Sequence, residues 1–241
     1  MTRFFVAPEE MSGNTITLYG ENAQHAKVLR LKLRETVLVC DGDGHECVCE
    51  ITASDPWTLE TIERRDARSE AQVQVSVYMA FPKADKLEHV IQKATELGAY
   101  EIVAFPSARC VSRPDAKSLK KKQERWQKIA ASAAEQSGRG RIPEIIVLDS
   151  FAQAVSRAVQ ADRALMFYEH EQACTLKMAL SRGSYASVSL LTGPEGGLEE
   201  AEVTQARRAG MLVCTLGRRI LRCETAPLCA LSAVMYAAGE Y

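Results

Sequence analysis

The segment with the clearest capacity for chemistry covers residues 192–198 and reads Thr-Gly-Pro-Glu-Gly-Gly-Leu. It follows 187–192, a run with the composition of a buried strand. Gly193, Gly196 and Gly197 stand within five residues, so backbone N–H and C=O groups can approach a bound molecule with no side chain between them. A tight turn from strand to helix is the simpler explanation when this segment is taken alone.

A second candidate segment, 216–227, reads Leu-Gly-Arg-Arg-Ile-Leu-Arg-Cys-Glu-Thr-Ala-Pro and follows another apolar run. Gly217 and three arginines come directly after the expected strand, where open parallel sheets bind their ligands. We therefore expect these arginines to serve a semi-buried site rather than a solvated helix face. Glu224 and Thr225 have a simpler explanation, because such residues commonly cap the first turn of a helix.

Several nucleotide and hydrolase motifs are missing from the sequence. It contains no G-x-G-x-x-G after the first expected α/β strand, no G-x-x-x-x-G-K-[ST] and no G-x-S-x-G. An ordinary dinucleotide site, a nucleoside triphosphatase and an α/β-hydrolase are therefore not expected.

Eight cysteines and four histidines raise the question of a metal site. No two cysteines have C-x-x-C spacing and each histidine stands alone, whereas zinc ligands usually lie closer together. We therefore expect no metal and reduced thiols, several of them packed as small core residues. The cysteines are Cys40, Cys47, Cys49, Cys110, Cys174, Cys214, Cys223 and Cys229.

The charge is unevenly distributed along a chain whose formal net charge is −1. Residues 109–143 contain ten Lys or Arg against Asp115, Glu124 and Glu135, which gives this segment a charge of about +7. A solvated helix face and a surface for phosphates explain this run equally well, since a local positive field attracts a polyanion whatever the total charge.

Length and composition fit one large domain or two modest ones. The chain has 241 residues, 46% of them hydrophobic and 25% charged, and can bury a core without disulfides or metal. No apolar run approaches the roughly 20 residues that span a bilayer, and the N-terminus lacks the apolar stretch of a secretion signal. We expect a cytoplasmic protein with no membrane contact.

Residues 1–70 have the pattern of a small β-barrel. Asp41-Gly42-Asp43-Gly44 separates two alternating runs and predicts a hairpin turn. Asn22 is the expected N-cap of a short helix over 23–31. The expected strands cover 15–19, 36–40, 46–51 and 57–62.

A charged linker over 64–70 separates this barrel from a second domain, 71–241, in which strands and helices alternate. Such alternation predicts an α/β fold with a mostly parallel sheet covered on both faces. The expected strands cover 73–81, 101–105, 145–148, 164–168, 187–192 and 211–216. The expected helices cover 86–97, 119–137, 151–160, 171–180, 199–209 and 225–238.

Together, the two glycine-bearing segments closely resemble two sequence blocks of the SPOUT methyltransferases, most closely those of the RsmE group. That group methylates N3 of a uridine in 16S ribosomal RNA. The similarity spans nearly the whole chain, and Cys223 is a departure from it. Further blocks that resemble the group are 25–30, Asp41-Gly42, Lys86 with 92–98, 125–129 and 134–139.

The resemblance implies a PUA-like barrel for RNA binding, followed by a SPOUT-like parallel sheet whose C-terminal part forms a trefoil knot, a rare feature among folds. It implies S-adenosylmethionine as the donor, 16S rRNA or the small ribosomal subunit as partner, and a homodimer. The apolar character of 225–238 agrees with a dimer, although a fully buried helix in a monomer explains it too.

The resemblance also assigns site residues. Those expected to bind the donor are Thr192, Gly193, Gly196, Gly197, Leu198, Leu216, Gly217, Ile220, Leu221, Arg222 and Ala226. Those expected to bind RNA, from the resemblance and the basic run, are Arg3, His25, Arg30, Lys86, Arg109, Arg113, Lys120, Lys121, Arg125 and Arg139.

The chemistry at N3 of uridine predicts three catalytic candidates. The N3 proton must leave before the nitrogen can attack, so a cation that favours the anion is needed. Arg222 is the candidate for that cation, and Glu135 or Glu224 for the proton acceptor. Either carboxylate has a commoner alternative as an ion-pair partner or a helix cap.

Two other functions stay open from the sequence. A non-catalytic RNA-binding or ribosome-assembly protein could keep the fold, but such a protein has no need of two complete glycine-bearing segments. A tRNA ribose methyltransferase of the same superfamily fits less well with the N-terminal barrel and with the run 221–225.

Overall fold

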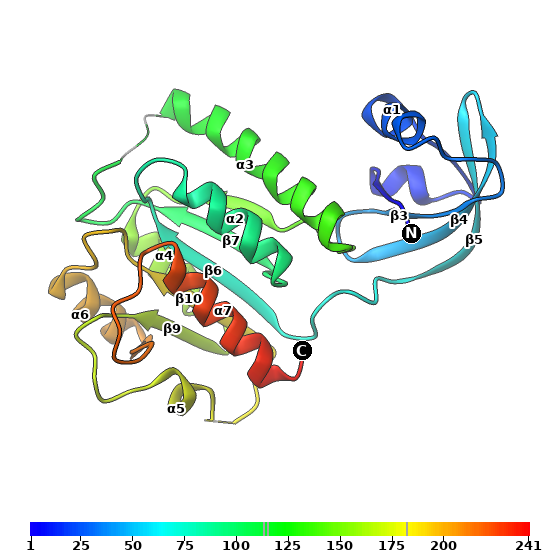
Figure 1. Cartoon of the computed structure of the whole chain (residues 1–241). Coiled ribbons are helices and arrows are strands. Elements are labelled where there is room, and N and C mark those ends of the chain that lie inside the picture. Colours follow the sequence, from blue (N-terminus) through cyan, green and yellow to red (C-terminus); the bar gives the residue numbers. More distant parts are fainter. Residues whose placement is uncertain (113, 115, 182) are drawn as a thin grey trace. The chain divides into compact units, whose positions relative to one another are not determined.

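The structure is a computed structural model that describes residues 1–112, 114, 116–181 and 183–241, and it divides into two compact units (Figure 1). The first unit contains residues 1–70 and 134–142, and the second contains 71–133 and 143–241. The sequence predicts 1–70 and 71–241, so the two divisions differ in where they place 134–142.

A curved sheet forms the first unit, with its strands in the order β1-β3-β4-β5-β2 in the described part of the chain. The predicted hairpin is confirmed, because β3 and β4 pair antiparallel on either side of residues 41–44. Gly42 and Gly44 there have positive φ angles, which glycine adopts without strain. The elements are β1 (Arg3–Phe5), η1 (Pro8–Met11), β2 (Thr15–Thr17), α1 (Gly20–Val28), β3 (Thr36–Cys40), β4 (His45–Ser54) and β5 (Trp57–Asp66).

Alternating side chains of these strands make the core of the first unit. Phe4, Ile16, Val37 and Leu59 are almost fully buried and pack with the strand cysteines of β4. Burial raises the pKa of Cys49 to about 11, so this thiol stays protonated. The expectation that several cysteines are free core residues is confirmed, and no group of potential metal ligands occurs among the described residues.

Two predictions for the first unit are wrong. Helix α1 begins at Gly20, and Asn22 lies in its first turn, where the side chain donates a 2.7 Å hydrogen bond to the carbonyl of Phe5 instead of capping the helix. The predicted linker over 64–70 is strand as far as Asp66, since the Arg65 guanidinium pairs with Glu46 on the neighbouring strand.

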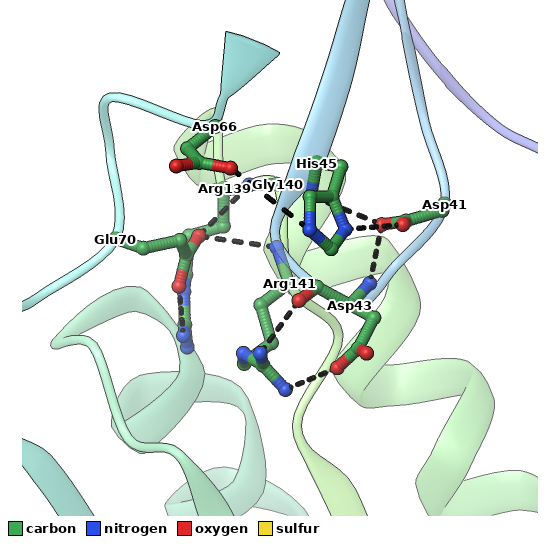
Figure 2. A network of polar contacts seen from close by, with 8 residues as sticks. All are labelled: Asp41, Asp43, His45, Asp66, Glu70, Arg139, Gly140 and Arg141. Carbon is green, nitrogen blue, oxygen red and sulfur yellow. Dashed lines mark hydrogen bonds and ion pairs between the residues drawn. The ribbon is translucent and has the colours of Figure 1, made fainter.

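Glu70 attaches the segment 134–142 to the first unit (Figure 2). Its carboxylate accepts hydrogen bonds from Arg139 Nη2 (2.7 Å) and from the backbone N–H groups of Gly140 (2.8 Å) and Arg141 (3.1 Å). The Arg141 guanidinium also pairs with Asp43 in the hairpin turn, at 2.6 Å. The segment directly after α3 is therefore bonded into the first unit by side chains that strand and helix patterns do not reveal.

The second unit contains a parallel sheet in the order β11-β9-β10-β6-β7-β8, as its described residues show. All five pairings are parallel, so the predicted mostly parallel sheet is confirmed. The strands are β6 (Gln74–Ala80), β7 (Glu101–Phe105), β8 (Glu144–Val147), β9 (Arg163–Phe167), β10 (Ser187–Thr192) and β11 (Leu212–Cys214).

Helices cover this sheet; α7 packs against β6 and β10, and α2 lies beside α7 (Figure 1). Two predicted elements are about twice as long as those observed. Over 171–180 only α5 is helical, because the Glu171 carboxylate binds the N–H groups of residues 172–174, and β11 covers only part of 211–216. The helices are α2 (Lys86–Glu96), α3 (Ala116–Ser137), α4 (Phe151–Ala158), α5 (Leu176–Leu180), α6 (Glu200–Ala209) and α7 (Thr225–Ala238).

Helix α3 protects the free edge of β8. The Gln127 side chain accepts from the N–H of Ile145 and donates to the carbonyl of Pro143, and Gln123 donates to the carbonyl of Ile145. These bonds satisfy edge groups that otherwise invite pairing with another chain. No described helix combines the length and apolar character needed to cross a membrane.

Candidate active site

Loops at the carboxyl ends of β6, β9, β10 and β11 surround an open cavity of about 390 Å³ in the second unit. These four strands are neighbours in the sheet, so their loops meet at one edge. Small-molecule sites typically measure roughly 300–1,000 Å³. The lining residues include all eleven residues predicted to bind the donor: Thr192, Gly193, Gly196, Gly197, Leu198, Leu216, Gly217, Ile220, Leu221, Arg222 and Ala226.

In the segment 192–198, close packing against other parts of the chain leaves little room for a side chain at the three glycines. A Cβ on Gly193 would lie 3.0 Å from Leu198 Cγ, and one on Gly196 would lie 3.2 Å from Arg109 Cβ. Gly197 has a φ of +69°, and a Cβ there would lie 2.2 Å from a carboxylate oxygen of Glu169. Close packing thus explains these three glycines, in addition to the predicted approach of a ligand.

Gly217 differs from those three glycines. Its φ is +108°, a conformation that L side chains rarely adopt, and no described atom beyond Gly217 and its two chain neighbours lies within 4 Å of a Cβ built on it. Gly217 lines the cavity, and the position that its Cβ would take is open. Gly217 is therefore the glycine at which the predicted close approach of a ligand has the most room.

Lys86, at the start of α2, joins the two glycine-bearing segments. Its Nζ lies 2.9 Å from Oε1 of Glu195 and 3.3 Å from Oε2 of Glu224. The backbone N–H of Lys83 donates to the same Glu195 oxygen, and the Cys223 thiol donates to Glu224. We call Lys86, Glu195 and Glu224 the Lys86 clamp. The Lys86 ammonium group binds these two carboxylates, so its placement does not support the predicted contact with RNA.

The clamp carries opposite charges that stabilise each other. The hydrogen bond to Glu195 raises the pKa of Lys86. Burial alone would raise the pKa of Glu195, but the Lys86 and backbone hydrogen bonds lower it. The pKa of Glu224 is also lowered, chiefly by its own backbone N–H. Burial and the bond to Glu224 raise the pKa of Cys223 to about 12, so that thiol remains a donor.

The three predicted catalytic residues make different contacts within their units. Arg222 lines the cavity with an exposed side chain, and its carbonyl accepts from Thr225 and Ala226 at the start of α7. Glu224 belongs to the clamp, and its lowered pKa makes it a weak proton acceptor. Glu135 lies in the first unit, 3.0 Å from Nδ1 of His25, and is not among the cavity-lining residues.

A third loop, which follows β9, also belongs to the site, although the sequence did not predict it. Phe167, Tyr168 and Glu169 line the cavity between the two glycine-bearing segments, because β9 lies between β10 and β11 in the sheet. The carboxyl end of the predicted strand 164–168 could have indicated this loop, because ligands of parallel sheets bind at such strand ends. Strand order, which the sequence pattern does not give, is what brings this loop into the site.

Two residues predicted to bind RNA are buried in ion pairs. The Arg3 side chain is 9% exposed and pairs with Glu46 at 3.1 Å, and the Arg139 side chain is 4% exposed and pairs with Glu70 at 2.7 Å. Guanidinium groups held inside the first unit are not available to phosphates. Their placement supports a structural role instead of the predicted one.

The other predicted RNA contacts are more accessible. Arg30, Lys120 and Lys121 are exposed, and Arg125 is exposed although it pairs with Glu88. Arg109 donates to the carbonyl of Gly196 and so supports the loop after β10. His25 is half-buried beside Glu135. Arg113 lies outside the described residues.

Comparison with known proteins places the chain in a family. Residues 69–235 match the family model described as an RNA methyltransferase domain, and residues 18–60 match the RNA methyltransferase PUA domain. The chain belongs to this RNA methyltransferase family, and the predicted combination of a PUA-like barrel with a SPOUT-like parallel sheet is confirmed.

The relatives narrow the family further. Ribosomal RNA small subunit methyltransferase E of Bacillus subtilis (strain 168) is 38% identical over 249 residues, which cover 98% of this chain and 96% of the relative. The crystal structure of ribosomal RNA small subunit methyltransferase E from Neisseria gonorrhoeae bound to S-adenosyl methionine is 30% identical, with a TM-score of 0.86 over 98% of this chain and 97% of that one.

A second similar structure also contains the methyl donor. The putative methyltransferase from Legionella pneumophila, solved with bound S-adenosyl methionine, is 28% identical, with a TM-score of 0.82 over 98% of each chain. The predicted resemblance to this group of rRNA methyltransferases is thus confirmed.

Proposed function

We propose that this protein transfers the methyl group of S-adenosylmethionine to N3 of a uridine in the 16S RNA of the small ribosomal subunit. The observation that carries this proposal is that both glycine-bearing segments line one cavity at the carboxyl ends of parallel strands. Relatives named as small-subunit rRNA methyltransferases, and two donor-bound neighbours, support the same function. A non-catalytic RNA-binding protein has no use for such a cavity.

The residues around the cavity suit this donor, which supplies an electrophilic methyl group when bound. The cavity has room for a nucleoside-sized molecule, and the open face of Gly217 admits close approach to the backbone. Adenine offers donors and acceptors that backbone N–H and C=O groups can match. The eleven lining residues predicted from the sequence are therefore our assignment for the donor site.

The target atom requires help from the protein before it can react. N3 of uridine carries a proton whose pKa is comparable with that of a phenol, about 10, so the neutral base dominates at pH 7. Enzymes that modify a base usually bring it out of the stack into a pocket. Arg222 is the residue that we assign to stabilise the uridine anion, since it lines the cavity with a guanidinium free of the Lys86 clamp.

The N3 proton leaves to solvent water in the open cavity, since neither predicted carboxylate is suited to accept it. The bonds from Cys223 and Lys86 to Glu224 favour its ionised form and weaken it as a base. Glu135 lies 3.0 Å from Nδ1 of His25 in the first unit. Arg222 is thus the only one of the three predicted catalytic residues that we retain in the chemistry.

RNA binding is proposed for exposed basic residues of both units. Arg30 is exposed, as are Lys27, Lys32 and Arg34 beside it in the chain, and Lys120 and Lys121 are exposed on α3. Phosphate contacts by such side chains dominate the affinity of proteins for RNA. An enzyme that modifies ribosomal RNA in this way would act in the cytoplasm, on free 16S rRNA or on the assembled subunit.

A homodimer with a knotted C-terminal segment completes the proposal. Ile220 in the cavity and Tyr236 on α7 are 78% and 75% exposed, an unusual state for large apolar side chains that a second subunit would change. A monomer mass from light scattering at micromolar concentration would contradict the dimer.

Mass spectrometry of 16S rRNA tests the proposed reaction. RNA from a strain lacking this gene should miss one methyluridine, and purified protein with S-adenosylmethionine should restore it. Identical modification of 16S rRNA in both strains would contradict the proposal. Methylation of a ribose oxygen instead of N3 would point to the ribose methyltransferases of the same superfamily.

A further inference from the structure

The Glu169 carboxylate lines the cavity, but the methyl transfer proposed above does not use it. It follows β9, and its side chain lies directly against the loop after β10. A Cβ on Gly197 would lie 2.2 Å from Oε1 and 3.2 Å from Oε2 of Glu169. Both carboxylate oxygens are therefore next to the backbone of the segment 192–198.

Because β9 lies between β10 and β11, the loop that carries this carboxylate lies between the two glycine-bearing segments. The strand order is β11-β9-β10, so the loop after β9 emerges between the segments 192–198 and 216–227. A ligand held by both segments must pass in front of this loop. Glu169 is thus beside whatever part of the ligand bridges the two segments.

The Glu169 carboxylate differs from the other acidic groups at this site. Glu195 and Glu224 are bound by Lys86, and their hydrogen-bonding capacity is largely used. For Glu169, the described part of the chain supplies no ion pair and no hydrogen bond. Its two oxygens accept hydrogen bonds and donate none when ionised, so they are available to a ligand that brings donors.

The loop that carries Glu169 is held in place. Oε1 of Glu171 accepts from the N–H groups of Gln172, Ala173 and Cys174, at 2.7–3.2 Å, and its other oxygen accepts from Arg207. The N–H of Tyr168 donates to the carbonyl of Cys214 at 3.1 Å. A fixed backbone at this point orients a side chain for specific recognition.

We propose that Glu169 recognises the ribose of the methyl donor by accepting hydrogen bonds from its 2′- and 3′-hydroxyl groups. This inference rests on the proposed function, since it takes S-adenosylmethionine as the ligand. The ribose is bonded directly to the adenine that the backbone segments are assigned to hold, and its two adjacent hydroxyls match the two oxygens of a carboxylate. Glu169 is therefore a specificity residue for a ribonucleoside donor.

The α-ammonium group of the donor is the competing partner for Glu169. That group shares a carbon atom with the donor's carboxylate, and Arg219 and Arg222 line the same cavity as cations suited to a carboxylate. The ribose presents two adjacent hydroxyl donors to the two oxygens of one carboxylate, and this match favours the ribose. A donor analogue that lacks the amino acid separates the two cases.

Calorimetric titration of Glu169→Ala and Glu169→Gln with donor analogues tests the inference. The probes are S-adenosylhomocysteine, 5′-methylthioadenosine, which has the ribose but no amino acid, and the 2′-deoxy and 3′-deoxy forms of S-adenosylhomocysteine. Glu124→Ala, at an exposed site on α3 that does not line the cavity, is the matched control.

We expect Glu169→Ala to bind S-adenosylhomocysteine and 5′-methylthioadenosine more weakly by similar factors, about tenfold to a hundredfold, the size of lost hydrogen bonds to a charged group. Each deoxy analogue keeps one of the two hydroxyls, so it should bind the wild type more weakly than S-adenosylhomocysteine does and lose less affinity than S-adenosylhomocysteine in Glu169→Ala; Glu169→Gln should fall between the wild type and Glu169→Ala. Equal affinities for wild type and Glu169→Ala would overturn the inference, as would a loss confined to S-adenosylhomocysteine. If the wild type bound no S-adenosylhomocysteine, the proposed function itself would be wrong.

Discussion

Nζ of Lys86 lies 2.9 Å from Oε1 of Glu195, which joins the first turn of α2 to the loop after β10. The same nitrogen reaches Glu224, at the end of the loop that follows β11. Since the pKa of Lys86 is raised and those of both glutamates are lowered, all three groups stay charged between their ordinary values of 4.5 and 10.5. We infer that the Lys86 clamp fixes the spacing of the two segments that line the cavity.

Replacing Lys86 with Met should weaken the binding of S-adenosylhomocysteine about tenfold, the size of one lost charge-assisted hydrogen bond. The variant leaves two carboxylates together without their cation, so the loops should move apart. Isothermal titration calorimetry measures the change. Lys86→Arg should retain part of the affinity, because the positive charge remains.

Lys83→Met is the matched control for the clamp, because Lys83 contributes only its backbone N–H to Glu195 and its side chain is exposed. It should bind S-adenosylhomocysteine as the wild type does. Equal losses in Lys83→Met and Lys86→Met would show that the clamp has no special role.

The sequence predicted much of the sheet and both glycine-bearing segments, because strand composition and local glycine spacing are short-range signals. It did not predict the loop that contains Glu169, since that loop joins the site only through the order of β9, β10 and β11. It also assigned Arg3 and Arg139 to RNA. Charge alone does not distinguish a phosphate contact from an internal ion pair with Glu46 or Glu70.

Gly140→Ala should destabilise the first unit by about 1–3 kcal/mol, a usual cost of overpacking. A Cβ on Gly140 would lie only 2.1 Å from Cβ of Ala67, beside the contacts that Glu70 makes (Figure 2). Urea denaturation followed by circular dichroism measures the loss. Gly13→Ala is the control, since its nearest contact would be an ordinary 3.6 Å; equal stability of the two variants would refute the packing argument.

Neutralising Lys120, Lys121 and Lys122 to Gln should weaken RNA binding and make it less dependent on salt. These side chains are exposed on α3. Each phosphate contact contributes roughly 0.7–0.9 to the log–log slope of affinity against salt concentration. Fluorescence anisotropy with a 16S rRNA fragment measures that slope. If the triple variant bound RNA as the wild type does, the lysines of this basic segment would be part of a solvated helix face and not an RNA-binding surface.

Arg222→Ala should lower the methylation rate at pH 7 by roughly 10²-fold, the usual effect of removing one group that stabilises a developing anion. The loss should shrink towards pH 10, because uridine then ionises without help. Single-turnover kinetics across this pH range provide the profile.

Arg218→Ala is the control for that experiment, as Arg218 is an exposed arginine of the same loop that does not line the cavity. It should keep the wild-type profile. An Arg222→Ala profile that runs parallel to the wild type at every pH would remove Arg222 from the chemistry and leave it a role in binding or structure.

The binding of S-adenosylhomocysteine to the wild type, Gly217→Val and Gly210→Val is the most direct test of the donor site. Gly217 and Gly210 have similar φ angles, +108° and +103°, and both have open space where a Cβ would stand, but only Gly217 lines the cavity. Calorimetric titration should show binding to the wild type and to Gly210→Val, and none to a folded Gly217→Val. Undiminished affinity in Gly217→Val would contradict the assignment of the donor to this cavity.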